Sequence, residues 1–381
     1  MQLSFVPLRH NAFLATAFVA ILAASFASRV TAVMGLYLAI AFCVVLANVR
    51  IFGTATQREQ NVALVTVLIV CVMLPISLLK SETAVIHFVV VLLSLGAGFV
   101  LSRDVKVYVT ASKLTLIAAQ LYVIQFLARH GLKNFPLQDI IPDSSSNGVT
   151  SYMVLLQANY CIVNYAYTRR TSLFTAMVTL AICIVGFGRG SILAATAILA
   201  VGVGCRVWLA GRGRATLVVL ATFVAGVVLA VHFAEQIEIF VNSNTKIGSG
   251  LFDAHRYSMI NEYLAKIDAV TLWTGASYTG TSIVSEYNNN PHNSFIRAHY
   301  IFGLPYLALL FAMPVYLIHK AHSGSVKVYS AALWVVVMFR CSTEPILFPT
   351  LLDFFYFAVC FILARDPGRD AALADRDPHP A

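Results

Sequence analysis

The stretch Asn288-Asn289-Asn290-Pro291-His292-Asn293-Ser294-Phe295-Ile296-Arg297-Ala298-His299-Tyr300-Ile301-Phe302-Gly303-Leu304-Pro305-Tyr306 marks the point where a long polar segment becomes apolar. Asn290 suits a helix N-cap, and Pro291 suits the first helical position because the N–H that proline lacks would be unpaired there. This predicts that His292 lies in the first turn of a helix, where backbone N–H groups and the helix dipole favour a bound anion. A solvated histidine at a helix start is an equally good interpretation of these local features.

The composition is that of an integral membrane protein. Of the 381 residues, 59% are hydrophobic and 11% are charged, whereas soluble domains are close to one-quarter charged. The seven cysteines lack zinc or disulfide spacing, which predicts small core residues. Recurring apolar runs predict an all-α polytopic fold with about twelve transmembrane helices. They lie at residues 11–28, 30–49, 62–79, 84–101, 107–127, 150–167, 171–187, 190–209, 215–233, 293–318, 328–339 and 346–364.

The distribution of lysine and arginine predicts the orientation, because these residues are enriched in short cytoplasmic loops. With the N-terminus inside, 15 of the 26 basic residues fall on the cytoplasmic side, and both termini are cytoplasmic. The net charge of +9 then follows from topology and does not indicate a nucleic-acid partner. The cytoplasmic set is Arg9, Arg50, Arg58, Arg103, Lys106, Arg169, Arg170, Arg206, Arg212, Arg214, Lys320, Lys327, Arg365, Arg369 and Arg376. The outer set is Arg29, Lys80, Arg129, Lys133, Arg189, Lys246, Arg256, Lys266 and Arg340.

Two outer-face segments are longer than a plain connection requires. They are residues 128–149 and residues 234–291, the latter between the ninth and tenth predicted helices, and loops of this length are usually functional. The transmembrane domain is expected to span residues 1–364, followed by a disordered cytoplasmic tail at 365–381. The longer loop contains apolar residues at 3, 4, 3 spacing, which predict an amphipathic helix on the bilayer surface: Tyr257, Ile260, Leu264 and Ile267.

The stretch Gly186-Phe187-Gly188-Arg189-Gly190-Ser191 separates two apolar runs at the outer face. Three glycines permit a tight reversal, and Ser191 can cap the helix that follows. Arg189 at the tip combines a guanidinium with nearby backbone N–H groups, which suits a phosphate. A plain interfacial arginine is the alternative, but an arginine between glycines gains little from packing, and this favours a functional role.

Other ionisable residues also gather towards the outer leaflet. Arg256 lies on the predicted amphipathic helix, and Arg297 and Arg340 lie near the outer ends of helices, with Glu344 close to Arg340. Structural pairing or snorkelling accounts for these arginines about as well as function does. The clustering favours an outer-face active site over a midplane transport site.

Metal and nucleotide chemistry have no supporting motif. The one Asp-x-Asp pair, Asp375 and Asp377, lies in the predicted cytoplasmic tail, and the chain has neither a Gly-x-Ser-x-Gly elbow nor an ATPase-type phosphate loop. We therefore expect no metal and no cofactor, so the energy for any reaction comes with the substrate.

The opening stretch resembles a motif of a known family. His292-Asn293, nine residues, Gly303, two residues and Tyr306 match the H[NSQ]-x9-G-x-x-[GTY] pattern of bacterial O-antigen ligases and the related Wzy-type polysaccharide polymerases. Three further stretches are similar to that family's motifs, in the same order, over about residues 140–320. They are Gly188-Arg189-Gly190-Ser191; Ser146-Asn147-Gly148-Val149-Thr150-Ser151-Tyr152; and Arg256 with Leu272-Trp273-Thr274-Gly275-Ala276, where Ala276 replaces a family glycine.

The resemblance implies a GT-C-like glycosyltransferase of the bacterial inner membrane with a periplasmic site. It implies that a glycan moves from undecaprenyl diphosphate to an acceptor hydroxyl, with inversion and without metal or nucleotide. By this resemblance His292 is the base or the orienting group for that hydroxyl, and Arg189 and Arg256 hold the diphosphate. The expected substrate-binding residues are Asn293, Arg297, Arg340, Gly188 and Gly190.

The branch of this family stays open at this stage. A polymerase extends a lipid-linked repeat, whereas a ligase transfers the finished chain to lipid A core or to protein. We favour a polymerase of O-antigen or exopolysaccharide, because no feature selects lipid A core. Other polysaccharide assembly proteins are possible partners alongside the lipid-linked glycan, its acceptor and the bilayer. A flippase for the same lipids predicts an internal repeat and mid-membrane ionisable residues, and a purely structural subunit leaves the Arg189 hairpin and the long loop unexplained.

Overall fold

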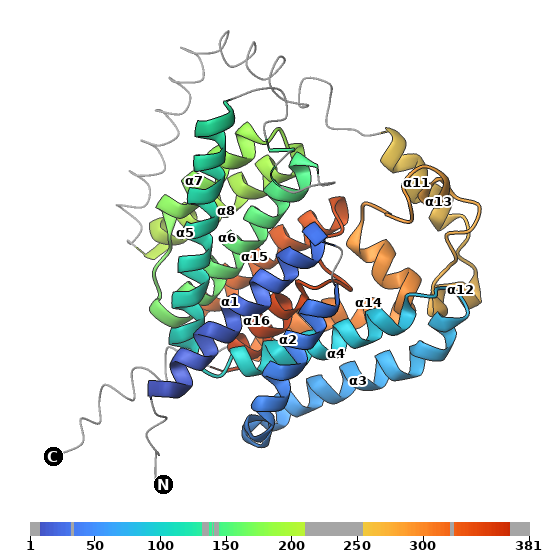
Figure 1. The fold of residues 1–381 in the computed structure, drawn as a ribbon, viewed down its shortest axis with the longest axis horizontal. Helices are drawn as coiled ribbons and strands as arrows, with labels where there is room; N and C mark the ends of the chain where they lie inside the picture. The colour runs from blue at the N-terminus through green and yellow to red at the C-terminus, as the bar shows by residue number, and fades with distance from the viewer. Residues whose placement is uncertain are drawn as a thin grey trace, which may run out of the picture.

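The computed structural model describes residues 8–31, 34–131, 137, 138, 140, 145–209, 254–320 and 324–365, and every regular element within them is a helix (Figure 1). The longer helices are α1 (Leu8–Thr31), α2 (Met34–Ala47), α3 (Gln57–Leu78), α4 (Ala84–Leu101), α5 (Val105–His130), α6 (Ser146–Thr168), α7 (Leu173–Val185), α8 (Arg189–Leu209), α11 (Ala254–Leu264), α14 (Ser294–Lys320), α15 (Gly324–Thr343) and α16 (Asp353–Ala364). The shorter elements are the 3-10 helix η1 (Val49–Thr54), α12 (Ala269–Thr274) and α13 (Ser282–Ser285).

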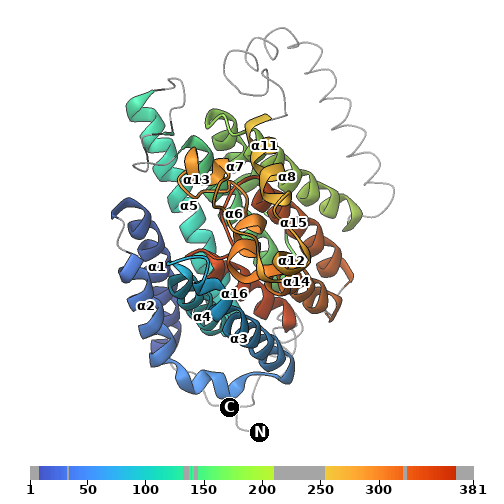
Figure 2. The ribbon, with the colours of Figure 1, turned by 90° about the vertical axis from the view of Figure 1, so that its right-hand side faces the viewer.

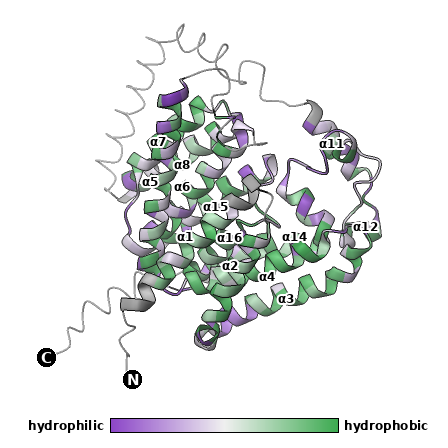
Figure 3. Ribbon diagram, viewed as in Figure 1, coloured by the Kyte–Doolittle hydropathy of each residue, from purple (hydrophilic) through white to green (hydrophobic). Residues whose placement is uncertain are grey.

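The all-helical prediction is confirmed for the described residues. Each predicted apolar run among them coincides with a helix, and six helices are long and apolar enough to cross a membrane, namely α3, α4, α5, α8, α14 and α15. Figure 3 shows α3 and α4 coloured hydrophobic along most of their length. The predicted run 215–233 and the tail beyond residue 365 lie outside the described residues. Twelve spans therefore stay a prediction.

The last helix begins later than the sequence predicts. The apolar run covers 346–364, but α16 starts at Asp353 because the preceding residues form a turn around its carboxylate. Asp353 Oδ1 accepts the N–H of Phe348 at 2.9 Å, and Oδ2 accepts that of Thr350 at 3.1 Å. Pro349 between them has no N–H to donate to a helix.

A buried carboxylate joins three helix ends on the side predicted to be cytoplasmic. Thr56 and Glu59 form a capping box that starts α3. Glu59 Oε1 lies 2.6 Å from Arg103 Nη2, at the end of α4, and 2.9 Å from Arg365 Nε, directly after α16. The Glu59 side chain has no exposed surface, and a buried charge of this kind is tolerated only when it is paired. These ion pairs therefore fix α3, α4 and α16 relative to one another.

The centre of the bundle is α16, whose residues from Asp353 to Leu363 are all buried. It packs against α4 at Gly98, where a Cβ atom would lie 2.8 Å from Phe357 Cβ and 2.9 Å from the backbone nitrogen of Ala358. Both distances are shorter than Cβ atoms tolerate. The close approach of the two helices therefore requires glycine at this position.

Five of the seven cysteines are buried, as the sequence predicts, but that prediction is wrong for Cys43 and Cys71, which are exposed. These two lie on α2 and α3, and exposed neighbours such as Phe42 and Val72 show that these helix faces point outward. An apolar face of this kind suits lipid, and hydropathy alone does not separate a lipid-facing position from a core position.

The short helices of residues 254–291, the segment predicted to lie at the outer face, have a small core of their own. It consists of Met259, Tyr263, Ala276, Tyr278, Ile283 and Ile296. Figures 1 and 2 show α11, α12 and α13 gathered on one side of the bundle, near α14. The predicted helix around residue 260 is present as α11, but it ends at Leu264, before Ile267. Tyr257 and Leu264 are exposed, whereas Met259 and Tyr263 are buried, so the contact of the predicted apolar face with a bilayer stays a prediction.

We expect Gly98→Ala to destabilise the protein, because the added methyl group must displace the backbone of α16. Overpacking of this kind costs about 1–3 kcal/mol. The matched control is Gly204→Ala in α8, where a Cβ atom would meet nothing within 4 Å and the better helix propensity of alanine applies. Thermal unfolding in detergent should show a lower midpoint for the first variant and an unchanged or higher midpoint for the second. Equal midpoints would contradict this account of the packing.

Candidate functional site

His292 lies just before α14, not in its first turn, so the predicted helix start is wrong. The helix begins at Ser294, and Asn293 caps it: Asn293 Oδ1 accepts the N–H groups of Phe295 at 2.8 Å and Ile296 at 3.1 Å. Asn290, the predicted cap, accepts instead the N–H of His292 at 3.0 Å. His292 itself has a positive φ of 46°. The chain thus turns sharply at His292 before it enters the helix.

The Arg189 hairpin forms as predicted, but for a different reason. None of its glycines has a positive φ; Phe187 carries the left-handed turn with φ of 55°. The glycines instead permit close packing, since a Cβ at Gly188 would lie 2.8 Å from Thr150 Oγ1, and one at Gly190 would lie 3.1 Å from Arg340 Nη1, at the end of that side chain. Arg189 is the first residue of α8.

Ser191 does not cap α8, in contrast to the sequence prediction. It lies in the first turn of the helix and is fully buried. Its hydroxyl accepts a hydrogen bond from Thr150 Oγ1 at 2.9 Å. The serine therefore attaches the start of α8 to α6.

Glu344, directly after α15, connects the basic residues of the site. Its Oε1 lies 3.1 Å from Arg256 Nη2 and 3.7 Å from Arg340 Nη2, and its Oε2 lies 3.9 Å from His292 Nδ1. Arg256 also donates to the Thr343 carbonyl at 2.6 Å. The Glu344 side chain is 9% exposed. One buried carboxylate thus brings together residues from α11, α15 and the turn before α14.

Arg340 is the most deeply buried cation of this group, with 2% of its side chain exposed. Besides Glu344, it donates from Nη1 to Thr343 Oγ1 at 2.5 Å and from Nη2 to the Ser151 hydroxyl. Ser151 belongs to α6. Arg340 therefore has a structural role, linking α15 to α6, as well as a position at the wall of a cavity.

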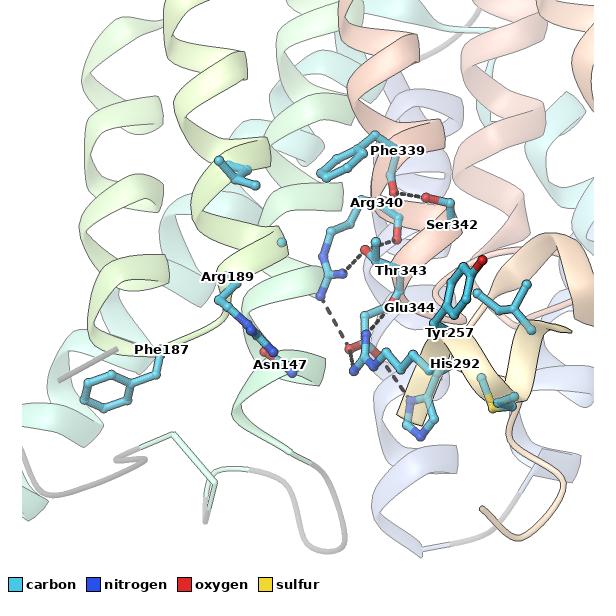
Figure 4. Close-up of a pocket in the computed structure, with 15 residues that line it drawn as sticks. Asn147, Phe187, Arg189, Tyr257, His292, Phe339, Arg340, Ser342, Thr343 and Glu344 are labelled. Carbon is cyan, nitrogen blue, oxygen red and sulfur yellow. Dashed lines mark hydrogen bonds and ion pairs between the residues drawn. The ribbon is translucent and has the colours of Figure 1, made fainter. Parts of the chain in front are cut away.

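These side chains surround one cavity of about 440 Å³ (Figure 4). Among the described residues its lining includes three arginines, one histidine and one carboxylate, so positive charge is in excess. Figure 4 shows Arg189 and Asn147 on one side and His292 with Tyr257 on the other. The lining is Asn147, Phe187, Arg189, Gly190, Leu193, Arg256, Tyr257, Met259, Ile260, His292, Phe339, Arg340, Ser342, Thr343 and Glu344.

Three of the eight predicted site residues do not line this cavity. Asn293 is occupied in capping α14, and Gly188 packs against α6. Arg297 donates to the carbonyls of Pro345 and Leu347 and so holds the turn after Glu344. The other five, His292, Arg189, Arg256, Arg340 and Gly190, come together although they are far apart in the sequence.

The connecting role of Glu344 was not recognised from the sequence. The available signal is its spacing of four residues from Arg340, a spacing at which side chains are neighbours in a helix. From the sequence, pairing with Arg340 and a role in function are about equally good interpretations. Asn147 was also not singled out as a site residue, although the sequence comparison included it in a motif. It enters the cavity because α6 begins at Ser146.

The glycines of the motifs at 272–276 and 292–306 are positions of backbone contact. Gly303 has φ of 67°, and a Cβ there would lie 1.9 Å from the Trp273 carbonyl oxygen. Gly275 has φ of 86°, and a Cβ there would lie 2.0 Å from the His299 carbonyl oxygen. The end of α12 is therefore seated directly on α14, and this contact helps to position the turn that carries His292.

Charge around Glu344 favours its ionised form. Burial alone would raise the pKa of this carboxyl, but the neighbouring His292 ring and the guanidinium groups of Arg340 and Arg256 hold the pKa below its usual value. The carboxylate in turn neutralises part of the positive charge in the lining. What remains suits an anion that carries more than one charge.

Comparisons with known proteins do not place the chain in a family. No protein-family model, no curated protein and no solved structure matches it.

The pKa of Glu344 is lower in the folded protein than the ordinary carboxyl value of 4.5. The ion pairs of Glu344 therefore stabilise the fold fully above pH 4.5. This stabilisation is lost as the pH falls through the lowered pKa of the folded protein. We expect the unfolding midpoint of the wild type to fall between about pH 5 and about pH 3 more steeply than that of Glu344→Gln. Differential scanning fluorimetry across this range measures both slopes. The exposed Glu82→Gln variant is the control and should keep the wild-type slope. Identical slopes for wild type and Glu344→Gln would show that the carboxylate is not held by its partners.

Proposed function

We propose that this chain is a GT-C-like membrane glycosyltransferase that moves a glycan from undecaprenyl diphosphate to an acceptor sugar hydroxyl at the periplasmic face of the inner membrane. The observation that carries the proposal is the common cavity of Arg189, Arg256, Arg340 and His292, four residues that are distant in the sequence. The resemblance of the surrounding motifs to O-antigen ligases and Wzy-type polymerases agrees with it.

The arginines suit the leaving group of this reaction. When the bond between the anomeric carbon and the diphosphate breaks, negative charge grows on the departing phosphate oxygens. Fixed guanidinium groups at that position stabilise the transition state without a metal, since they need no reorganisation as the charge develops. In this proposal Arg189 and Arg256 bind the diphosphate, and Arg340 adds positive charge at the cavity wall.

His292 suits the acceptor. The acceptor oxygen forms its bond to the anomeric carbon from the face opposite the departing diphosphate, and its proton must go to a base. The Nδ1 atom of His292 faces Glu344 at 3.9 Å, so Nε2 points to the other side of the ring and can receive that proton. A carboxylate close to Nδ1 stabilises the protonated ring that this step produces.

The cavity also has an apolar part that suits a lipid-linked donor. Phe187, Leu193 and Phe339 line it beside the arginines, and Leu193 and Phe339 are large exposed hydrophobic residues of the long apolar helices α8 and α15. An anion attached to a hydrocarbon chain matches this combination of linings. We infer that the donor enters from the outer leaflet.

We expect His292→Ala to lower glycan transfer by about 10²–10⁴-fold, the usual contribution of a general base, and Arg189→Ala to lower it by about 10²–10³-fold, as for a lost oxyanion donor. The assay uses the purified protein in lipid nanodiscs with an undecaprenyl-diphosphate-linked repeat unit, and products are separated by size. His130→Ala and Arg129→Ala, at exposed positions of α5, are the matched controls and should keep wild-type rates. A wild-type rate for a correctly folded His292→Ala protein would exclude the catalytic role.

Of the two branches we propose the polymerase, with the ligase as the alternative. Deletion of the gene in its own bacterium distinguishes them. Single repeats on the final acceptor indicate that a polymerase has been lost, as we expect. Long chains that accumulate on undecaprenyl diphosphate indicate instead that a ligase has been lost.

A further inference from the structure

The helix α12 lies beside a predicted membrane span and not beyond its end. Its carbonyl groups contact α14 at two places: the Leu272 carbonyl accepts from His299 Nε2 at 2.8 Å, and the Trp273 carbonyl packs on Gly303. Gly303 is nine residues after Ser294, the first residue of α14. Gly303 is also the point where α14 is kinked, since its φ of 67° and ψ of −171° are not helical. The part of α14 before the kink is about 14 Å long at 1.5 Å per residue. The helix α12 therefore lies beside the kink, at the far end of this first part of α14.

The side of α12 that faces away from α14 is apolar and exposed. Val270 is 69% exposed and Trp273 is 58% exposed. The adjacent end of α3 is also apolar and exposed. Leu78 is its last residue and is exposed, and Leu79, which follows it, is 88% exposed. Exposed apolar side chains of this size are unfavourable in water.

This apolar surface continues the outward face of α3. Exposed apolar residues recur along α3 at a helical spacing, at Leu64, Leu68 and Val72, and lead to Leu79. The side chain of Lys80, next to Leu79, donates to the carbonyls of Thr274 and Gly275, the latter at 3.3 Å, and to that of Tyr300 at 2.7 Å. The end of α12 is thus fixed to the end of a membrane-spanning helix, and the two apolar faces form one surface.

Polar groups mark the other end of α12. Asp268 caps the helix by accepting the N–H groups of Val270 at 2.8 Å and Thr271 at 2.7 Å, and its carboxylate is exposed. Lys266 is exposed nearby. A short helix with a charged start and a tryptophan near its end has the polarity of an element at the boundary between headgroups and acyl chains.

From these contacts we propose that α12 and the end of α3 are embedded in the outer leaflet, with Val270, Trp273 and Leu79 in contact with lipid. This assigns bilayer contact to α12, in addition to the contact that the sequence predicts for α11. The segment that carries Arg256 and His292 is then attached to the membrane at α12 as well as through α14, so its distance from the bilayer is fixed.

Tryptophan fluorescence tests this placement directly, because the chain has only three tryptophans. The variant Trp208→Phe/Trp334→Phe leaves Trp273 alone and is reconstituted into phosphatidylcholine vesicles with or without brominated acyl chains. We expect brominated lipid to reduce Trp273 emission at least twofold and aqueous iodide to have little effect. The matched control is a protein whose only tryptophan comes from Glu286→Trp, at an exposed polar position of the same outer segment; iodide should quench it and brominated lipid should not.

Two results would overturn the proposal. Quenching of Trp273 by iodide and not by brominated lipid would place α12 in water, and insensitivity to both would show that protein covers it. If the double variant fails to fold, the difference in brominated-lipid quenching between the wild type and Trp273→Phe gives the same information with one conservative substitution. No difference between these two proteins would also overturn it.

Discussion

The arrangement of the site depends on one buried carboxylate. Glu344 is almost inaccessible, and an ionised carboxylate in such a place costs several kcal/mol unless cations pair with it. Arg340 approaches from its own helix and Arg256 from the outer segment, while His292 lies at the carboxylate's second oxygen. Removal of Glu344 would leave the guanidinium groups of Arg256 and Arg340 without this shared carboxylate, so the position of α11 relative to α15 is coupled to the charge balance of the cavity. This coupling explains how a long outer segment presents Arg256 at a defined position.

The helices were predictable because a membrane-spanning helix must be both apolar and about 20 residues long, so each apolar run of that length predicts one helix. Within the described residues every apolar run became a helix, and the main misplaced start was that of α16. There the turn depends on hydrogen bonds from Phe348 and Thr350 to Asp353, a local competition that hydropathy does not register. The outward-facing cysteines were mispredicted for a related reason, since lipid and core are equally apolar.

The site was predictable in part. Arg189, Arg256, Arg340 and His292 were selected from residue type and predicted membrane face, and the structure brings them to one cavity. The capping residue was assigned wrongly because Asn290 and Asn293 are both good caps, and only the backbone turn at His292 decides between them. Arg297 illustrates the opposite case: its carbonyl partners are 48 and 50 residues away in the chain, a distance over which sequence patterns give no guidance.

The glycines show how a short motif can encode a tertiary contact. Gly275 and Gly303 each face a backbone carbonyl at a distance that no side chain permits, and both have positive φ. The glycine that the pattern requires eleven residues after His292 is therefore the residue at which α14 contacts α12. Tyr306, one turn further along, is fully buried in the main core. The spacing in the motif is a property of packing, while the chemistry belongs to the histidine at its start.

The mixed lining of the cavity limits the substrates that fit the proposed reaction. A soluble phosphate needs only the arginines, and a neutral lipid needs only Phe187, Leu193 and Phe339. The two linings occur together where the apolar helices α8 and α15 meet the outer segment, and excess positive charge is held there although Glu344 offsets part of it. An amphiphile whose anionic group is joined to a hydrocarbon chain matches both linings, and for this reason we favour the lipid-linked diphosphate of the proposed reaction over either kind of simple ligand.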